Sequence, residues 1–172
     1  IATKTNRIVK LLDGYKTKVL DTRKTTPGLR YLEKWAVRIG GGLNHRIGLY
    51  DMILIKDNHV DYAGGITNAI SQANEYIKRT ERELQIEIEV RNLQELKQVL
   101  AVGNVDRIML ANFDLHALRE AVRLIDGKFL TEASVGIVED NVTAYAACGV
   151  DFISMGELTH SLKSLDLSLK AC

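Results

Sequence analysis

The chain has 172 residues, of which 46% are hydrophobic and 26% are charged, and its formal net charge is +1. This length suits one domain with a full hydrophobic core, and this mixture is that of an ordinary globular protein. No apolar run approaches the roughly 18 residues of a membrane span, and the first residues show no secretory signal. We therefore expect a single domain over residues 1–172 that has no contact with a membrane.

Charge is distributed unevenly along the chain. The first 60 residues hold 12 Lys and Arg against 5 Asp and Glu, whereas the remaining 112 hold 11 against 17. A basic third within a neutral protein favours an anionic small molecule over a nucleic acid, which usually requires a continuous basic patch. The two cysteines, Cys148 and Cys172, have no metal-ligand spacing, so we expect reduced thiols and a cytoplasmic protein.

Short apolar runs alternate with longer amphipathic ones. Helices are expected at the N-terminus and at 30–39, 66–79, 93–101, 114–125 and 139–148, and strands at 18–24, 52–58, 85–91, 106–112, 129–134 and 151–157. Asn92 and Asp114 are N-cap residue types before two of these helices, and Gly127 and Gly149 stand where C-caps are expected. The connections are too long for hairpins, so the pattern predicts an incomplete, TIM-like parallel α/β barrel of about six βα units.

Polar residues gather where the predicted strands end. They are Arg23, Lys24, Lys56 to His59, Glu89, Asn112, Glu132, Ser134, Ser154 and Gly156. In parallel α/β proteins this edge is where binding sites are built, so we expect one convergent pocket. With His45 and Arg46 from the glycine-rich loop 40–46, the pocket offers four fixed cations and a histidine, which suits a ligand with several negative groups.

Other interpretations of these patterns remain open. The loop 40–46 could be a flexible helix exit with a solvated Arg, because Gly is the ordinary helix terminator. Glu87 and Glu89 lie on one face of their strand and could pair with inner lysines as structural charges. The small residues of "EASVGI" (132–137) and "SMGELTHS" (154–161) follow the last two strands, where barrels commonly bind phosphate.

Five segments carry a resemblance to a known family. They are "DTRKTTPGLR" (21–30), "EKWAVRIGGGLNHRIGLYDMILIKDNHV" (33–60), "EIEV" (87–90), "TEAS" (131–134) and "GELTHS" (156–161). Together they resemble the quinolinate phosphoribosyltransferases, also called nicotinate-nucleotide pyrophosphorylases (carboxylating). The resemblance implies an incomplete α/β barrel that, with Mg2+, converts quinolinate and phosphoribosyl pyrophosphate to nicotinate mononucleotide, CO2 and pyrophosphate in NAD biosynthesis.

The resemblance also implies roles for individual residues. Four would bind the two carboxylates of quinolinate: Thr22, Arg23, His45 and Arg46. Three would be catalytic: Lys24 and Lys56 at the phosphoribosyl or pyrophosphate group, and Glu89 at the ribose hydroxyls or their Mg2+. Four would surround the 5-phosphate: Ser134, Gly136, Gly156 and His160.

The sequence departs from the family pattern at two positions. Ala111 stands where a ribose- or metal-binding Asp is expected, and Val135 replaces a glycine of the phosphate loop. The family also has an N-terminal sandwich domain that lends an Arg to the neighbouring subunit of a homodimer, and this chain begins after the point where that domain ends. We therefore expect weakened activity. The alternatives are a catalytically silent or engineered barrel used as a scaffold, and a paralogue acting on another anionic substrate.

Overall fold

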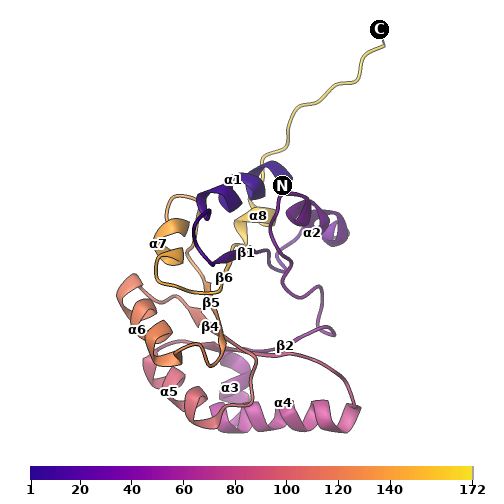
Figure 1. Cartoon of the computed structure of the whole chain (residues 1–172). Coiled ribbons are helices and arrows are strands. Elements are labelled where there is room, and N and C mark those ends of the chain that lie inside the picture. Colours follow the sequence, from indigo (N-terminus) through magenta and orange to yellow (C-terminus); the bar gives the residue numbers. More distant parts are fainter. Residues whose placement is uncertain (172) are drawn as a thin grey trace.

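A six-stranded parallel sheet forms the centre of the computed structural model, which describes residues 1–171. The strands are β1 (Lys18–Leu20), β2 (Ile53–Ile55), β3 (Ile86–Val90), β4 (Arg107–Ala111), β5 (Leu130–Ser134) and β6 (Phe152–Ser154). Their order is β1-β6-β5-β4-β3-β2, so the curved sheet is open between β1 and β2 (Figure 1). The prediction of an incomplete parallel α/β barrel is confirmed.

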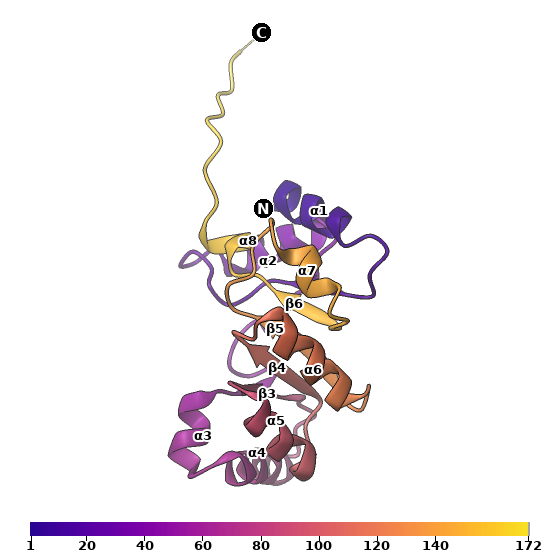
Figure 2. The same ribbon diagram turned by 90° about the vertical axis from the view of Figure 1, so that its left-hand side faces the viewer.

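The helices surround the outer side of this sheet (Figures 1 and 2). They are α1 (Ala2–Leu11), α2 (Arg30–Ile39), α3 (Asp57–Ala63), α4 (Ile66–Thr80), α5 (Leu93–Val102), α6 (Leu115–Ile125), α7 (Val142–Ala146) and α8 (Glu157–His160). The short helices α3 and α8 were not predicted. The predicted strand 52–58 is wrong beyond Ile55, because the chain leaves the sheet there and turns into α3.

The strand predicted at 18–24 is also too long, since β1 ends at Leu20 and the basic segment that follows is a loop. The N-cap predictions are accurate for two helices, whereas the C-cap predictions are wrong, since α6 and α7 are capped by Asp126 and Ala147 and the predicted Gly127 and Gly149 follow them. The Asn92 side chain accepts the amide N–H groups of Gln94 and Glu95, and the Asp114 side chain accepts that of Ala117. These bonds satisfy donors that have no partner inside the helix.

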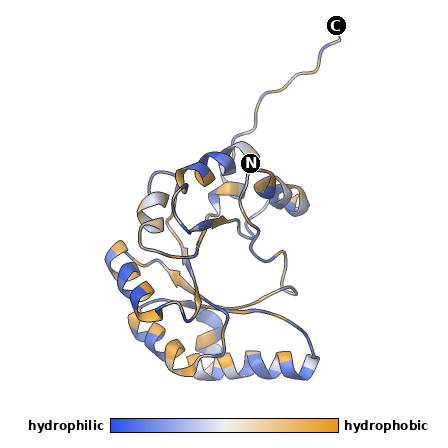
Figure 3. Ribbon diagram, viewed as in Figure 1, coloured by the Kyte–Doolittle hydropathy of each residue, from blue (hydrophilic) through white to orange (hydrophobic). Residues whose placement is uncertain are grey.

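The hydrophobic core lies between the sheet and the helices. Ile88, Ile108 and Ile153 are completely buried on neighbouring strands and face helix residues such as Leu96 and Leu118. The longer helices carry an apolar and a polar side (Figure 3). Each buried Ile or Leu contributes about 1.5–3 kcal/mol. Because side chains alternate along a strand, the opposite face of the sheet is left for polar groups.

The remaining general expectations concern membranes and cysteines. Within residues 1–171 no helix has both the length and the apolar character needed to cross a bilayer. Cys148 is buried and free, and Cys172 lies outside the described residues. After α8, the described residues 161–171 form neither helix nor strand and extend away from the barrel (Figure 1).

Candidate active site

A cavity of about 590 Å³ lies at the carboxyl ends of the strands. Its walls are formed by Thr22, Arg23, Lys24, His45, Arg46, Leu54, Lys56, Glu89, Met109, Glu132, Ser134, Val135, Gly136, Ile137, Val138, Ser154, Gly156, Glu157 and His160. We call it the strand-end cavity. It contains all eleven residues to which the resemblance assigns a role, because the ends of parallel strands converge at one edge of the sheet. Four other polar residues expected in the pocket do not line it: Asp57, Asn58, His59 and Asn112.

Two arginines in this cavity lack an anionic partner. Among the ion pairs within residues 1–171, none involves Arg23 or Arg46. Arg23 Nε is buried without a hydrogen-bond partner, and Arg46 Nη1 reaches only the Met52 carbonyl oxygen at 3.4 Å. Burial and the charge of Arg23 lower the pKa of Arg46. Two half-buried guanidinium groups in this state favour binding of an anion.

The two lysines of the cavity follow β1 and β2. Lys56 Nζ lies 3.4 Å from Glu89 Oε2, so the carboxylate at the end of β3 already has a cationic neighbour. The backbone of Lys24 is held by Thr159, whose Oγ1 donates a 2.7 Å hydrogen bond to the Lys24 carbonyl oxygen. The loop after β1 is thereby joined to α8 across the cavity.

The loops after β5 and β6 have the small residues and the backbone shape of an anion site. Val135 and Gly136 both have positive φ, at 75° and 72°. Ser154 Oγ and Ser134 Oγ are 2.9 Å apart. At Gly156 an added Cβ would approach the His160 ring to 2.8 Å, so glycine allows this ring to lie close to the backbone. Positive φ is unfavourable for a β-branched residue, so Val135 is strained.

Beneath the strand-end cavity lies a group of charged side chains from the loop 40–46 and three strands. His45 Nε2 is 2.9 Å from Glu87 Oε2 and 3.5 Å from Glu132 Oε2. Arg107 Nη1 is 3.1 Å from Glu132 Oε2 and 4.0 Å from Glu87 Oε2, and its guanidinium lies 4.3 Å from the centre of the Phe152 ring. We call His45, Glu87, Arg107 and Glu132 the buried charge cluster.

Burial and mutual charge set the protonation of this cluster. Burial lowers the pKa of His45, but Glu132 and Glu87 outweigh it and raise the pKa to about 9. Burial and the charge of Glu132 raise the pKa of Glu87 to about 7. Burial also acts to raise the pKa of Glu132, but His45, Ser154 and Arg107 together outweigh it and lower that pKa. His45 Nδ1 accepts the Arg46 amide N–H at 2.7 Å, which requires a neutral ring with its proton on Nε2, so this geometry rather than the raised pKa sets the protonation state of His45 in the structure. Protonation of His45 Nδ1 would therefore remove the hydrogen bond that holds the Arg46 amide.

A second buried ion pair supports the same loop. The Asp21 carboxylate accepts hydrogen bonds from Lys34 Nζ, from Asn44 Nδ2 at 2.5 Å and from the His45 amide at 2.9 Å. Asp21 and Lys34 are 0% and 1% exposed. Burial raises the pKa of Asp21 and lowers that of Lys34, and in each case the partner charge opposes the shift. Sequence reasoning missed this pair and Arg107, because Lys34 lies within a helix and Arg107 stands at the beginning of a strand, and only strand ends were searched for polar residues.

The comparisons with known proteins agree with this geometry. The family model described as quinolinate phosphoribosyl transferase, C-terminal domain, matches residues 1–170. The chain belongs to this family. The resemblance noted in the sequence is therefore confirmed.

Similar proteins of the quinolinate phosphoribosyltransferase family come from plants and bacteria. The chloroplastic nicotinate-nucleotide pyrophosphorylase [carboxylating] of Arabidopsis thaliana is 49% identical over 166 residues, covering 88% of this chain and 48% of the relative. The probable nicotinate-nucleotide pyrophosphorylase [carboxylating] of Bacillus subtilis (strain 168) is 46% identical over 169 residues, covering 98% and 57%. The chain thus spans about half the length of the curated relatives it matches.

Solved structures of the family share the fold. NadC from Streptococcus pyogenes superposes with a TM-score of 0.90 at 42% identity, covering 99% of this chain and 58% of that one. The nicotinate-nucleotide pyrophosphorylase from Francisella tularensis also gives a TM-score of 0.90, at 48% identity, covering 97% and 58%. The incomplete barrel described above is therefore the C-terminal domain fold of the family.

The two departures from the family pattern occupy different environments. Ala111 ends β4 and is 7% exposed, two residues after the cavity-lining Met109 and on the same side of the strand, but it is not itself part of the cavity wall. Val135 lines the cavity and is 54% exposed. A longer acidic side chain at position 111 would extend from this strand end toward the space that the cavity occupies.

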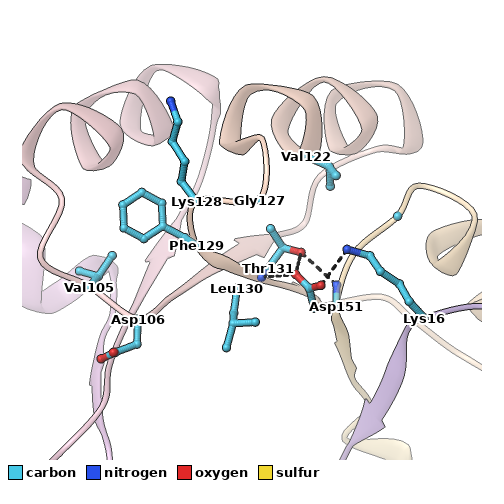
Figure 4. Close-up of a pocket in the computed structure, with 11 residues that line it drawn as sticks. Lys16, Val105, Asp106, Val122, Gly127, Lys128, Phe129, Leu130, Thr131 and Asp151 are labelled. Atoms are coloured by element: carbon cyan, nitrogen blue, oxygen red, sulfur yellow. Dashed lines mark hydrogen bonds and ion pairs between the residues drawn. The ribbon is translucent and has the colours of Figure 1, made fainter.

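A second cavity, of about 360 Å³, lies at the opposite edge of the sheet (Figure 4). Its polar groups are bonded to one another. Lys16 Nζ is 2.7 Å from Asp151 Oδ1, and Thr131 donates to Asp151 Oδ2 from its amide and its hydroxyl. These bonds tie β5 to the start of β6 and to the segment before β1, so this edge stabilises the barrel.

Proposed function

We propose that this domain binds quinolinate and phosphoribosyl pyrophosphate in the strand-end cavity and transfers the phosphoribosyl group, yielding nicotinate mononucleotide, CO2 and pyrophosphate for NAD biosynthesis. One observation carries the proposal: Arg23 and Arg46 line this cavity, and no anionic group within residues 1–171 pairs with either of them. Two guanidinium forks match two adjacent carboxylates, and Lys24 and Lys56 add point charges for phosphate groups.

The chemistry requires positioning and charge stabilisation rather than a protein nucleophile. The bond from ribose C1 to pyrophosphate breaks and a bond from C1 to the pyridine nitrogen forms, so positive charge develops on the sugar. The carboxylate beside the nitrogen then leaves as CO2, and a proton takes its place on the ring carbon. Lys24 and Lys56 would stabilise the departing pyrophosphate, while Arg23 and Arg46 hold the ring in line.

The residues present fit a magnesium ion only in part. Glu89 is a carboxylate at the cavity wall, but Lys56 lies 3.4 Å from it and Ala111 offers no oxygen. Mg2+ commonly uses one or two carboxylates together with substrate phosphates. Glu89 would therefore be the protein ligand of a magnesium ion that arrives with phosphoribosyl pyrophosphate, and the ion would neutralise charge on the pyrophosphate.

The assembly and location of the protein are also proposals. A homodimer in which a neighbouring subunit lends an Arg would add a cation to an already basic cavity. The Arabidopsis relative is named chloroplastic and the Nicotiana glauca relative mitochondrial, so a cytoplasmic location for this chain remains a prediction.

A second candidate is a barrel that binds substrate but turns over slowly or not at all. The strained Val135 at the phosphate loop and the methyl group of Ala111 favour it, since both weaken the side of the cavity proposed for phosphoribosyl pyrophosphate. Quinolinate binding without product formation would distinguish this candidate from a full enzyme.

Calorimetric titration tests the proposal. Quinolinate and phosphoribosyl pyrophosphate are each titrated into the chain with and without Mg2+, and nicotinate mononucleotide is then assayed by mass spectrometry. We expect quinolinate to bind without Mg2+ and phosphoribosyl pyrophosphate to bind more tightly with it. An Arg38→Lys variant is the matched control, because Arg38 is exposed on α2 and does not line the cavity. Equal, weak heats for both ligands in every condition would refute the proposal.

A further inference from the structure

His45 is held by the protein through its backbone as well as its ring. Its amide N–H donates to Asp21 Oδ1 at 2.9 Å, and its carbonyl oxygen accepts a hydrogen bond from Lys34 Nζ at 3.1 Å. On the ring, Nδ1 accepts the Arg46 amide N–H at 2.7 Å. One ring nitrogen is therefore already occupied by the residue that follows in the chain.

The other ring nitrogen faces away from any ligand in the strand-end cavity. His45 Nε2 is buried and lies 2.9 Å from Glu87 Oε2 and 3.5 Å from Glu132 Oε2. Glu87 is 0% exposed and does not line the cavity. A carboxylate ligand could reach Nε2 only by displacing a buried glutamate, and it would then meet like charge. His45 thus lines the cavity while its Nε2 is buried next to Glu87.

We propose that His45 is a positioning residue, not a substrate ligand: anchored by Glu87 and Glu132, it fixes the backbone of Arg46 so that the Arg46 guanidinium is ready for an anion. The inference rests on the proposed function and deepens it, because it assigns the recognition of the substrate carboxylates to Arg23 and Arg46. The direct link is the hydrogen bond from the Arg46 amide to Nδ1.

The location of this anchor explains why the fold needs it. The sheet is open between β1 and β2, and the loop that carries His45 and Arg46 joins α2 to β2 across that opening. On the β1 side, Leu43 pairs with Leu20 and Asp21 holds the His45 amide. On the other side the ring meets β3 and β5 through their glutamates. The ring therefore holds the later part of a loop whose earlier part, at Leu43, is paired with β1.

A metal ion is a competing role for the same side chains. One ligand atom from each of His45, Glu87 and Glu132 lies within 4.8 Å of the others, and two carboxylates with an imidazole are a common ligand set for divalent metals. However, Arg107 Nη1 is already 3.1 Å from Glu132 and 4.0 Å from Glu87. This guanidinium supplies the positive charge that a divalent ion would otherwise bring, and it would repel one.

A double-mutant cycle on quinolinate affinity tests the inference. The variants are His45→Ala, Arg46→Lys and the double variant, with Arg38→Lys as the control. If His45 acts through Arg46, each single change weakens binding by roughly tenfold and the double change is little worse than the larger single one. If His45 binds substrate independently, the two losses multiply, and that result overturns the inference.

If His45→Ala does not fold, as judged by circular dichroism and urea unfolding, two further variants test the inference. His45→Gln retains an amide donor toward Glu87, so we expect it to recover part of the affinity. Glu87→Gln changes a residue outside the cavity wall, and we expect it to weaken quinolinate binding several-fold with nearly unchanged dependence on Mg2+. Unchanged affinity in Glu87→Gln overturns the inference, as does tight Mn2+ or Zn2+ binding that Glu87→Gln removes.

The same experiment distinguishes a failure of the proposed function from a failure of the positioning role of His45. If the parent chain and the Arg38→Lys control both fail to bind quinolinate, the proposed function is wrong and the inference falls with it. If both bind but the losses at His45 and Arg46 multiply, the proposed function stands and only the positioning role is wrong.

Discussion

The buried pair of Asp21 and Lys34 gives the sharpest prediction for stability. We consider Lys34→Met, which keeps the length and apolar stem of the side chain but removes its charge. Asp21 would then be a carboxylate with 0% exposure and no cation, retaining only the Asn44 and His45 donors. Breaking one side of a buried ion pair typically costs about 3–5 kcal/mol, because the remaining charge is uncompensated.

For a domain of this size the cost corresponds to a fall in Tm of about 6–20 °C. The assay is urea unfolding followed by circular dichroism, with a thermal scan. Lys16→Met is the matched control: Lys16 pairs with Asp151 but its side chain is 60% exposed, so the loss should be roughly 0.2–1 kcal/mol. Adding Asp21→Asn to Lys34→Met should recover part of the lost stability, since no buried charge remains.

Two results would refute this reasoning. One is a loss in Lys34→Met no larger than that in Lys16→Met. The other is a double variant with Asp21→Asn that is less stable than Lys34→Met alone, which would mean that Asp21 does not need its cation. Either outcome would show that the loop holding His45 is not supported by this pair.

Two other predictions concern ligand binding. Arg23→Lys and Arg46→Lys should each weaken quinolinate binding, measured by calorimetry, because a point charge loses the bidentate geometry; parent-like affinity in both would contradict the assignment. Ala111→Asp combined with Val135→Gly should raise phosphoribosyl pyrophosphate affinity at saturating Mg2+ by roughly thirtyfold to a thousandfold, equivalent to about 2–4 kcal/mol. Quinolinate affinity should stay nearly unchanged. Equal phosphoribosyl pyrophosphate affinity in the parent and the double variant would show that neither position matters.

Much of the fold and the site could be predicted because both follow from local pattern. Apolar runs alternating with amphipathic ones indicated parallel strands and helices, and N-cap types such as Asn92 marked where helices begin. Once the strands are parallel, their polar ends must converge. The sequence positions of Arg23, Lys56 and Glu89 therefore predicted their common cavity without any knowledge of packing.

What the sequence did not predict depends on contacts between distant residues. Arg107 begins β4, away from the strand ends where the site was expected, and it contacts glutamates on two neighbouring strands. Lys34 lies within an amphipathic helix, where a lysine usually faces solvent, and it is instead completely buried against Asp21. Burial of a charge is decided by which partner the fold brings to it, and no local pattern encodes that partner.

The most direct test of the account is a crystal structure of this chain with quinolinate. We predict both carboxylates within hydrogen-bond distance of the guanidinium groups of Arg23 and Arg46 in the strand-end cavity, with His45 Nδ1 still bonded to the Arg46 amide. Quinolinate bound instead in the cavity beside Lys16 and Asp151, or to the ring nitrogens of His45, would contradict the account.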